Sequence, residues 1–354
     1  MELPRTIADF EARAAELLEA GPHGYYAGGA ADELTLRDNV EAWRRIAIRP
    51  RVLVDVSERD PRTTVLGRER PHPILVAPTA YHRLAHPGGE QATARAAAAS
   101  RAIYCLSSLA TATPAEVAEA APSGERWFQL YVFRDRGVSE ELLRSAVEHG
   151  YEAVVVTVDL PVLGFRERDL RSGYALADAL AAPSVAAMGR RGAFSMAEIG
   201  GLIDPSLTWD DIERFAAASD LPVLVKGVLT PEDARLAAEH GAGGVVVSNH
   251  GGRQLDTVPA GADALPAVVE AVGGEIDVLV DGGIRRGTDI LKALALGARA
   301  VMVGRPLIWG LAVGGEAGVK GVLDLLVAEF DAALALTGVP RASELGRECI
   351  SIPD

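Results

Sequence analysis

A histidine and an arginine follow a short apolar run, three residues apart, in the pattern of a functional loop. The run Gly244-Val245-Val246-Val247 is typical of a buried strand, and it leads into Ser248-Asn249-His250-Gly251-Gly252-Arg253-Gln254-Leu255-Asp256. A histidine can accept a proton near neutral pH, and an arginine can bind a carboxylate through two parallel hydrogen bonds. The loop therefore predicts a site for a small acid with an abstractable proton, although an ordinary polar loop would need similar turn residues.

The composition disfavours several classes of protein. The chain has 354 residues, 49% of them hydrophobic, which suits one barrel-sized domain or two smaller ones. Its formal net charge of -14 argues against a nucleic-acid partner or an anionic membrane surface. With only Cys105 and Cys349, neither a disulfide framework nor a cysteine zinc cluster is available, and we expect no metal site. The first 18 residues lack the unbroken apolar stretch of a secretion signal, so we expect a cytoplasmic protein.

Eight short apolar runs recur along the chain, and alanine-rich segments with helical spacing lie between most of them. The runs are nearly continuous rather than alternating, as expected for parallel strands buried on both faces. They are Ile74 to Ala77, Ile103 to Leu106, Trp127 to Val132, Ala153 to Val158, Pro222 to Val225, Val245 to Val247, Val278 to Val280 and Ala300 to Val303. This alternation predicts an α/β protein with a (β/α)8 barrel, or TIM barrel. A doubly wound sheet would need an early Gly-x-Gly-x-x-Gly turn, which we do not find.

Segments outside the repeats are expected to close and cover the barrel. Residues 1 to 47 have helical patterns, and Val52 to Val54 with Thr63 to Leu66 predict a short strand pair at the barrel floor. The connection from about Glu167 to Ile203 is far longer than an ordinary loop, and its position after the fourth strand favours a mobile lid over a disordered spacer. A long amphipathic helix is expected from Glu316 to Leu336.

We therefore expect residues 1 to 354 to form a single domain. It divides into an N-terminal part with helices and barrel-closing strands (residues 1 to 70), the barrel with its lid at about 167 to 203 (residues 71 to 310), and a C-terminal helix and tail (residues 311 to 354).

The carboxyl ends of the strands converge on one face of such a barrel, where active sites lie. In chain order this face receives Pro78, Thr79, Ala80, Ser107, Gln129, Tyr131, Thr157, Asp159, Lys226, His250, Arg253, Asp281, Gly282, Gly283, Arg285, Gly304 and Arg305. The loops after the last two strands pair glycine amides with an arginine, which predicts a bound phosphate.

Uncharged polar groups and one lysine occupy the middle of that face. Ser107, Gln129 and Thr157 suit the polar edge of a flat heterocycle, although any one of them could be a satisfied core group. Lys226 ends an apolar run, and a lysine is costly to bury without an anionic partner. A reduced flavin, which carries negative charge, would be such a partner.

Together these residues resemble the FMN-dependent 2-hydroxy acid oxidase and dehydrogenase family, which includes glycolate oxidase, lactate oxidase, mandelate dehydrogenase and hydroxymandelate oxidase. The resemblance covers nearly the whole chain. Its motifs are Tyr25-Tyr26-Ala27-Gly28-Gly29-Ala30, Ala77-Pro78-Thr79-Ala80, His86-Pro87-Gly88-Gly89-Glu90, Leu224-Val225-Lys226-Gly227, the His250 loop, Asp281 to Gly287 and Gly304-Arg305-Pro306. It implies FMN as the cofactor and the oxidation of an (S)-2-hydroxy acid to a 2-oxo acid, with hydrogen peroxide formed when oxygen reoxidises the flavin.

The resemblance also implies a role for each matching catalytic residue. His250 would be the base, Asp159 would orient and stabilise its protonated ring, and Lys226 would stabilise anionic reduced flavin. Arg253 and Arg166, with Tyr25, would bind the substrate carboxylate, while Tyr131 would bind the hydroxyl that becomes a carbonyl. Hydride transfer and a carbanion route both need this base and this clamp, so both stay open.

The cofactor would be held along its whole length. The resemblance places Pro78, Thr79 and Ala80 near the flavin N5, then Ser107, Gln129, Thr157 and Ser248 at the ring or its chain, Asp281 at the ribityl, and Gly283, Arg285, Gly304 and Arg305 at the phosphate. Gly282 is expected as a further cofactor-binding residue.

Two positions depart from plant-type glycolate oxidases. Leu109 stands where those enzymes have a tryptophan, and Tyr81 replaces a methionine, which favours a bulkier, aryl-bearing substrate such as mandelate or 4-hydroxymandelate. Phe165 also takes a position that is often basic in the family.

The electron acceptor and partners follow from the same resemblance. No haem domain precedes the barrel and no apolar membrane segment interrupts the lid, which disfavours cytochrome-linked and membrane-bound relatives. Ala80 favours oxygen, and a soluble non-oxygen acceptor stays open. An FMN isomerase or a ligand-binding flavoprotein would be expected to lack part of the set His250, Arg253 and Tyr131. Family members are commonly tetramers, so a homo-tetramer is one option.

Overall fold

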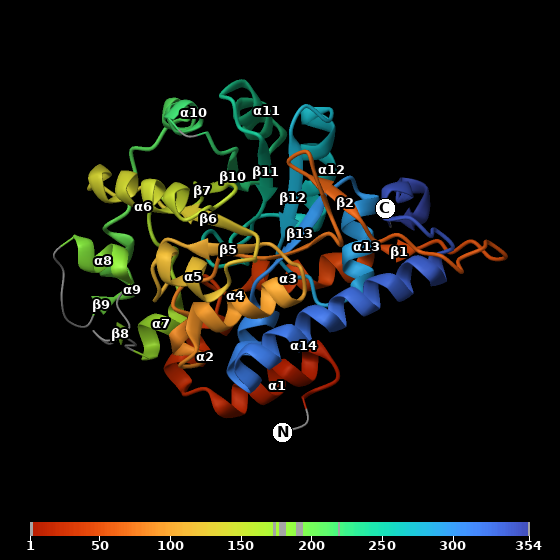
Figure 1. The fold of residues 1–354 in the computed structure, drawn as a ribbon, viewed down its shortest axis with the longest axis horizontal. Coiled ribbons are helices and arrows are strands. Elements are labelled where there is room, and N and C mark those ends of the chain that lie inside the picture. Colours follow the sequence, from red (N-terminus) through yellow and green to blue (C-terminus); the bar gives the residue numbers. More distant parts are fainter. Residues whose placement is uncertain (1–2, 173–174, 177–181, 189–193, 219, 353–354) are drawn as a thin grey trace.

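The computed structural model contains the predicted barrel, closed by eight parallel strands (Figure 1). It describes residues 3–172, 175–176, 182–188, 194–218 and 220–352. The barrel strands, in order around the ring, are β4 (Ile74–Val76), β5 (Tyr104–Ser107), β6 (Arg126–Leu130), β7 (Val154–Thr157), β10 (Val223–Val228), β11 (Gly244–Val247), β12 (Asp277–Asp281) and β13 (Ala300–Val303). Each predicted apolar run overlaps one of these strands, and β13 pairs with β4 to close the ring.

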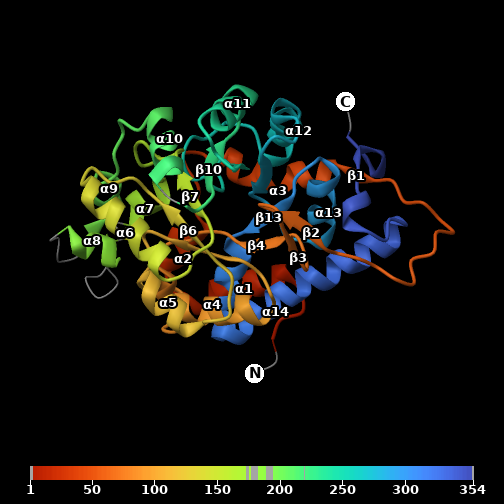
Figure 2. The same cartoon turned by 45° about the horizontal axis from the view of Figure 1, so that its top comes forward.

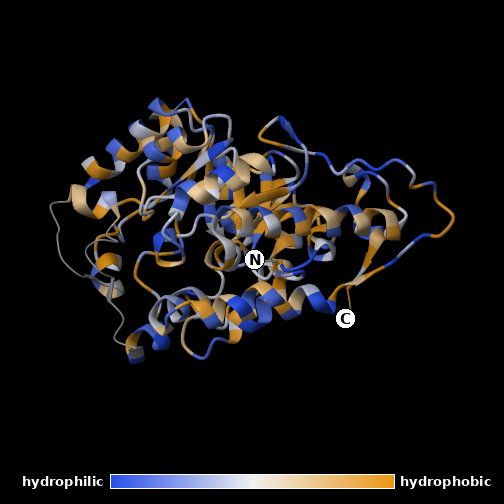
Figure 3. Ribbon diagram, turned by 60° about the horizontal axis from the view of Figure 1, so that its bottom comes forward, coloured by the Kyte–Doolittle hydropathy of each residue, from blue (hydrophilic) through white to orange (hydrophobic). Residues whose placement is uncertain are grey.

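Alternate residues of each strand belong to two separate cores. Leu75, Cys105, Val155 and Leu279 pack in one cluster inside the barrel. Their neighbours along the strands pack in a larger cluster with the surrounding helices. The two cores explain the continuous apolar runs, because both faces of every strand are buried. Figure 3 shows the result as orange strands at the centre of the molecule and mixed colours on the helices.

Eight helices follow the eight barrel strands and surround them (Figure 2). They are α4 (Gly89–Ala99), α5 (Pro114–Ala120), α6 (Arg136–Glu148), α10 (Trp209–Ala218), α11 (Pro231–Glu239), α12 (Gly261–Val272), α13 (Gly287–Ala295) and α14 (Arg305–Thr337). Several begin as their sequences indicate. Thr113 caps α5 and Thr230 caps α11, each followed by a proline that suits the first helical position.

The N-terminal region is helical as predicted. It contains α1 (Ile7–Leu17), α2 (Ala20–Ala27) and α3 (Leu34–Arg45), and α1 packs beside α14 (Figure 1). The predicted C-terminal helix is the second part of α14, which is interrupted at Gly314 and Gly315. The first part of α14 begins at Arg305, before the boundary that we placed between residues 310 and 311, and the predicted helix from Glu316 begins directly after the interruption.

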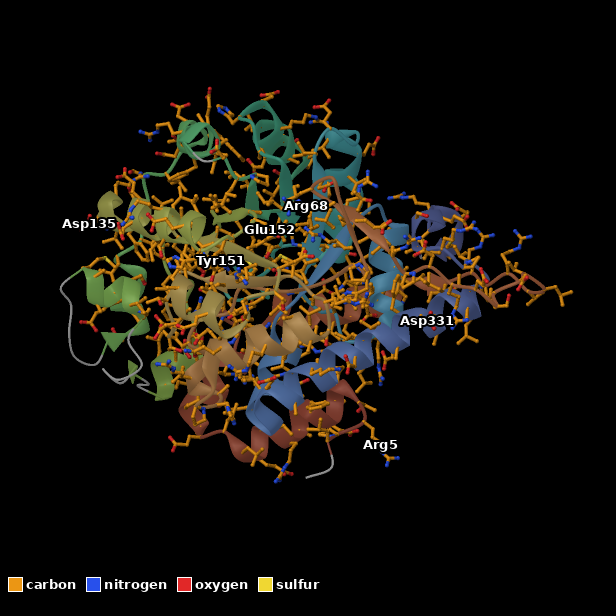
Figure 4. The ribbon with its side chains drawn as sticks, in the orientation of Figure 1. Arg5, Arg68, Asp135, Tyr151, Glu152 and Asp331 are labelled. Atoms are coloured by element: carbon orange, nitrogen blue, oxygen red, sulfur yellow. The ribbon has the colours of Figure 1, made fainter. Side chains whose placement is uncertain are left out.

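A hairpin closes the floor of the barrel, and only one of its two strands was predicted from the sequence. Strand β2 (Thr63–Val65) pairs with β3 (Arg68–Arg70) and not with Val52–Val54, whose side chains are exposed outside every described strand. Val65 and Leu66 pack against the inner barrel core. On β3, Arg68 forms an ion pair of 2.8 Å with Glu152, and the two labelled side chains lie close together in Figure 4. Strand β1 (Ala47–Ile48) pairs instead with β14 (Ile350–Ser351) near the C-terminus.

The long connection after β7 is not a structureless loop. Its described parts contain α7 (Glu167–Ser172), β8 (Ala175–Leu176), α8 (Pro183–Ala187), β9 (Phe194–Ser195) and α9 (Met196–Gly200). Residues 173–174, 177–181 and 189–193 of the predicted lid lie outside the described residues. Strands β8 and β9 pair with each other, so the insertion doubles back on itself before α10.

Candidate active site

A pocket with about 1140 Å³ of empty space lies at the carboxyl ends of the barrel strands. Most of the residues expected at that face line it. They are Tyr25, Pro78, Thr79, Ala80, Ser107, Tyr131, Arg166, Lys226, His250, Arg253, Asp281, Gly282, Gly283, Arg285, Gly304 and Arg305. Gln129, Thr157, Asp159 and Ser248 are not lining residues, but they contact or lie next to residues that are.

His250 is held between a carboxylate and a phenol. Its Nδ1 atom lies 2.9 Å from Oδ1 of Asp159, and its Nε2 atom lies 3.3 Å from the hydroxyl of Tyr131. The Tyr131 and His250 rings are stacked with an angle of 17° between their planes. A carboxylate on one nitrogen fixes the orientation of the imidazole, which leaves the other nitrogen beside Tyr131 for proton transfer.

The backbone of the loop explains how His250 reaches the pocket. His250 has a φ of 58°, in the left-handed region that favours glycine, and Gly251 and Gly252 follow with φ of 65° and 72°. The His250 amide donates to the Ser248 hydroxyl at 3.0 Å. A non-glycine residue in this conformation is strained, and such residues cluster at functional sites.

Burial and charge shift the acid–base properties of this pair. Burial lowers the pKa of His250 below its ordinary value, and the Asp159 carboxylate opposes that shift. Burial alone would raise the pKa of Asp159, but His250 and Lys226 outweigh it and hold the pKa below its usual range. The pair is therefore an anionic carboxylate beside a neutral imidazole, which is the state that a general base requires.

Two arginines face the same part of the pocket. The guanidinium of Arg253 lies over the Tyr25 ring, 4.8 Å from its centroid, and donates to the carbonyls of Tyr25 and Gly28. Arg166 donates to the carbonyl of Arg253 at 3.1 Å. Burial, reinforced by Arg253, lowers the pKa of Arg166 to about 10, which still leaves it charged at neutral pH. Within the described part of the chain, no carboxylate forms an ion pair with either guanidinium, so the two adjacent cations form a strong site for an anion.

Lys226 has an anionic partner within the protein, which corrects our reasoning from sequence. Its Nζ lies 3.1 Å from Oδ2 of Asp281 and donates to Ser248 Oγ at 2.9 Å. Although burial alone would lower it, Asp281 raises the pKa of Lys226, so the lysine is charged. Its burial therefore does not by itself require an anionic ligand. Ser248 is fully buried between this lysine and the His250 amide.

The loop after β12 is shaped by close contact with α3. Trp43 donates to the carbonyl of Gly282 at 2.9 Å, and Gly283 has a φ of 79°. A Cβ atom at Gly283 would overlap the carbonyl of Asn39. Only glycine fits at this position. The close contact with α3 holds the backbone of this loop, and with it the Arg285 side chain, at the pocket wall.

The side chain of Arg305, which we expected at the phosphate, also makes hydrogen bonds within the protein. Its three nitrogens donate to the carbonyls of Tyr26, Gly251 and Gly28 at 2.8 to 2.9 Å. Burial, with Arg253 nearby, lowers the pKa of Arg305 to about 9. Its side chain joins the N-terminal segment to the His250 loop. An anion would be bound by the remaining N–H groups of the guanidinium and by the start of α14 at Arg305.

Several buried polar atoms at this face have no hydrogen-bond partner within the described part of the chain. They include Nε2 of Gln129, Oγ1 of Thr157 and Oδ1 of Asp281. The Gln129 oxygen is already used, since it accepts from the Ser107 hydroxyl at 3.1 Å and from the Ser108 amide. Buried polar atoms normally find partners, so this edge suits a ligand that carries both donors and acceptors.

Sequence reasoning missed the apolar wall of the pocket. The wall is formed by Leu160, Leu163, Ile199 and Ile203, together with Tyr81 and Leu109, the two residues that differ from plant-type glycolate oxidases. No local pattern distinguishes these side chains from core residues, which is why they were missed. Ile199 and Ile203 come from the predicted lid segment and reach the pocket.

Tyr26 was also missed as a positioning group. Its hydroxyl donates to the carbonyl of Tyr81 at 2.6 Å. Tyr81 itself has a φ of 60°, and its buried hydroxyl has no partner within the described residues.

One cluster elsewhere has metal-ligand character. Ligand atoms of Asp210, Glu213 and His240 lie within 4.8 Å of one another, and the two acidic residues are exposed. Exposed acidic groups of this kind are common without an ion, so the expectation that the protein has no metal site stays a prediction.

Comparisons with known proteins agree with one another. A model of the FMN-dependent dehydrogenase family matches residues 14–352. Glycolate oxidase 1 of Zea mays is 48% identical over 350 residues, which is 97% of this chain and 95% of the relative. L-lactate oxidase of Nostoc sp. is 46% identical over 355 residues, which is 97% of this chain and 96% of the relative. Among solved structures, mandelate oxidase with (S)-4-hydroxymandelic acid has a TM-score of 0.92 at 42% identity, and the match covers 98% of both chains.

These relatives are named for different 2-hydroxy acids, so the substrate side chain has to be argued from the pocket. In the described chain, no helix is both long and apolar enough to cross a membrane.

Proposed function

The chain belongs to the FMN-dependent dehydrogenase family and oxidises 2-hydroxy acids with FMN, and we propose that its substrates are (S)-2-hydroxy acids with an apolar side chain and that oxygen is the acceptor. The observation that carries the substrate proposal is the apolar wall of the pocket. It stands beside the two arginines and the imidazole in one cavity.

The residues present fit FMN. The unpartnered atoms of Gln129 and Thr157 would meet the polar edge of the flavin, and the free carboxylate oxygen of Asp281 would meet the ribityl hydroxyls. The loop from Gly282 to Arg285 and the helix start at Gly304 and Arg305 would hold the phosphate. Pro78, Thr79, Ala80 and Ser107 line the same pocket, while Ser248 would act through Lys226.

Each catalytic side chain has a separate task. Bound FMN supplies the acceptor for two electrons. Arg166 and Arg253 would hold the substrate carboxylate, which places the α-carbon near His250. Nε2 of His250 would take the substrate proton, while Asp159 stabilises the imidazolium that results. Tyr131, whose pKa is raised by burial, keeps its proton and can donate to the substrate oxygen.

The wall sets the expected order of substrates. Leu109, Tyr81 and the isoleucines of the lid segment give an apolar surface that glycolate, which has no side chain, cannot use. Each methylene buried there contributes about 0.8 kcal/mol, or about fourfold in kcat/KM. The kcat/KM for lactate and longer alkyl acids, and for aryl acids such as mandelate, should therefore exceed that for glycolate.

The test is anaerobic mixing of the FMN-loaded protein with a panel of (S)-2-hydroxy acids from glycolate to 4-hydroxymandelate, while flavin absorbance is followed. Bleaching by the apolar acids at lower concentration than by glycolate is expected, followed by rapid recovery and peroxide formation in air. Slow recovery in air would point to another acceptor. Preference for glycolate would contradict the substrate proposal, and no bleaching by any acid would favour a non-redox isomerase or a ligand-binding flavoprotein.

A further inference from the structure

The side chain of Gln254 connects two loops of the active site through four hydrogen bonds. Its Oε1 accepts from the amide of Gly164 at 3.1 Å and from the guanidinium of Arg166 at 3.2 Å. Its Nε2 donates to the carbonyls of Asp159 at 2.8 Å and Val162 at 3.0 Å. A primary amide can make two bonds at each end, so both ends of this side chain are fully used within the protein.

The orientation of this amide is fixed by its partners. The Gly164 N–H can only donate and the two carbonyls can only accept, so the oxygen and nitrogen of Gln254 cannot exchange places. Gln254 is not among the residues that line the pocket. Its contacts are instead with the loop that carries Asp159 and Arg166.

The two loops are also packed in close contact. A Cβ atom at Gly164 would overlap the carbonyls of Arg253 and Gln254. Arg166 donates to the carbonyl of Arg253, so the two guanidinium groups are held near each other although they have the same charge. That repulsion is visible in the pKa of Arg166, which burial lowers and Arg253 lowers further.

The charge of the group that holds Arg166 matters as much as the position of that group. A carboxylate beside Arg166 would also hold it in place, but it would form an ion pair and compete with an incoming carboxylate. A neutral amide accepts the hydrogen bond and leaves the positive charge available. Within the described residues, neither Arg166 nor Arg253 has a carboxylate within ion-pair distance.

We propose that Gln254 is a positioning residue that holds Arg166 beside Arg253 without neutralising it, and so determines how tightly the carboxylate of the substrate binds. The proposal rests on the proposed function, because it takes the carboxylate of a 2-hydroxy acid as the group bound by the arginines. It assigns to Gln254 an effect on binding of the anion, with FMN binding left intact.

The test measures equilibrium binding of a 2-oxo acid, and of the amide of the same acid, to the oxidised FMN-loaded protein by the change in flavin absorbance. Gln254→Glu should raise the Kd for the 2-oxo acid about tenfold or more, because the new carboxylate pairs with Arg166. The Kd for the uncharged amide should stay within about twofold. Gln254→Met removes the hydrogen bonds without adding a charge, so it should weaken binding of the acid by a smaller factor.

The matched control is Leu255→Glu, which adds the same charge one residue along the chain, on a side chain that is 70% exposed. Equal Kd values for the acid in Gln254→Glu, Leu255→Glu and the unchanged protein would overturn the proposal. Equal loss of acid and amide binding would also overturn it, since that outcome indicates a general disruption of the site. FMN content is measured for each variant, and if Gln254→Glu does not fold, Gln254→Met must still weaken the acid and spare the amide.

Anaerobic reduction of the unchanged protein by 2-hydroxy acids, measured beside these binding experiments, separates this inference from the function on which it rests. If no 2-hydroxy acid reduces the flavin of the unchanged protein, the proposed function fails. If the unchanged protein is reduced and binds the 2-oxo acid while Gln254→Glu binds it equally well, only the role of Gln254 fails.

Discussion

Nδ1 of His250 lies 2.9 Å from a carboxylate oxygen of Asp159, although the two residues are 91 positions apart in the chain and follow different barrel strands. The contact fixes which imidazole nitrogen faces the carboxylate and which one lies beside Tyr131. It also joins an anion to a base whose pKa is lowered by burial. The geometry is that of an oriented general base.

Removal of the proposed base should separate cofactor binding from chemistry. His250→Ala is expected to keep bound FMN, because the loops at Gly283 and Gly304 lie on other strands, and to slow flavin reduction by about 10²- to 10⁴-fold. Anaerobic stopped-flow absorbance measures the rate, and the flavin content of the purified variant is the control. A variant that retains FMN and is reduced at an unchanged rate would remove His250 from the mechanism.

The pH dependence should follow the lowered pKa of His250. As the proposed base, His250 would act as the neutral ring, so flavin reduction should be independent of pH above about neutral and fall as the ring is protonated at a pH below its ordinary pKa of 6.5. In Asp159→Asn the charge that raises this pKa is lost. The acid limb should therefore move to lower pH, while the limiting rate falls because the imidazolium is no longer stabilised.

Rates between about pH 5 and 9 for the two proteins test this expectation. Movement of the acid limb to higher pH in Asp159→Asn would mean that the carboxylate does not act on His250 as described.

Leu109 should influence the choice of substrate. It lines the pocket and is only 8% exposed, so Leu109→Trp should fill space that an aryl or long alkyl group would use. We expect kcat/KM for such acids to fall about tenfold or more while that for glycolate changes little. The matched control is Leu336→Trp, the same substitution at a side chain that is 79% exposed. Equal losses for glycolate and mandelate would indicate a general effect on folding.

Gly283 should tolerate no side chain. Gly283→Ala combines a φ of 79° with overlap between the new Cβ and the Asn39 carbonyl, so it should lower both Tm and FMN retention. Gly274→Ala is a matched control, because Gly274 has a φ of 86° and a Cβ there meets nothing within 4 Å. The two variants share the backbone strain, and the difference in Tm between them reports the overlap with α3. Similar Tm and FMN content in both would contradict the close-contact argument.

The barrel and most of its site could be predicted from sequence for a simple reason. Parallel strands buried on both faces leave continuous apolar runs, and the residue after each run must lie at the carboxyl end of its strand. That is how His250, Lys226, Asp281 and Arg305 were placed at one face before any contact was known. The floor hairpin was predicted less well, because the apolar segment Val52–Val54 resembles a strand yet pairs with none of the described strands.

The sequence by itself determined the kinds of groups at the site, and the tertiary structure decided their partners. Lys226 pairs with Asp281, Arg305 donates to the carbonyls of Tyr26 and Gly28, and Gln254 holds Arg166. Each contact joins residues that are far apart in the chain. Lys226 and Asp281 lie on barrel strands, so the order of the strands brings these two residues near each other. Local periodicity carries no information on such contacts, because the arrangement of the loops at the barrel mouth in the folded chain determines which groups form hydrogen bonds.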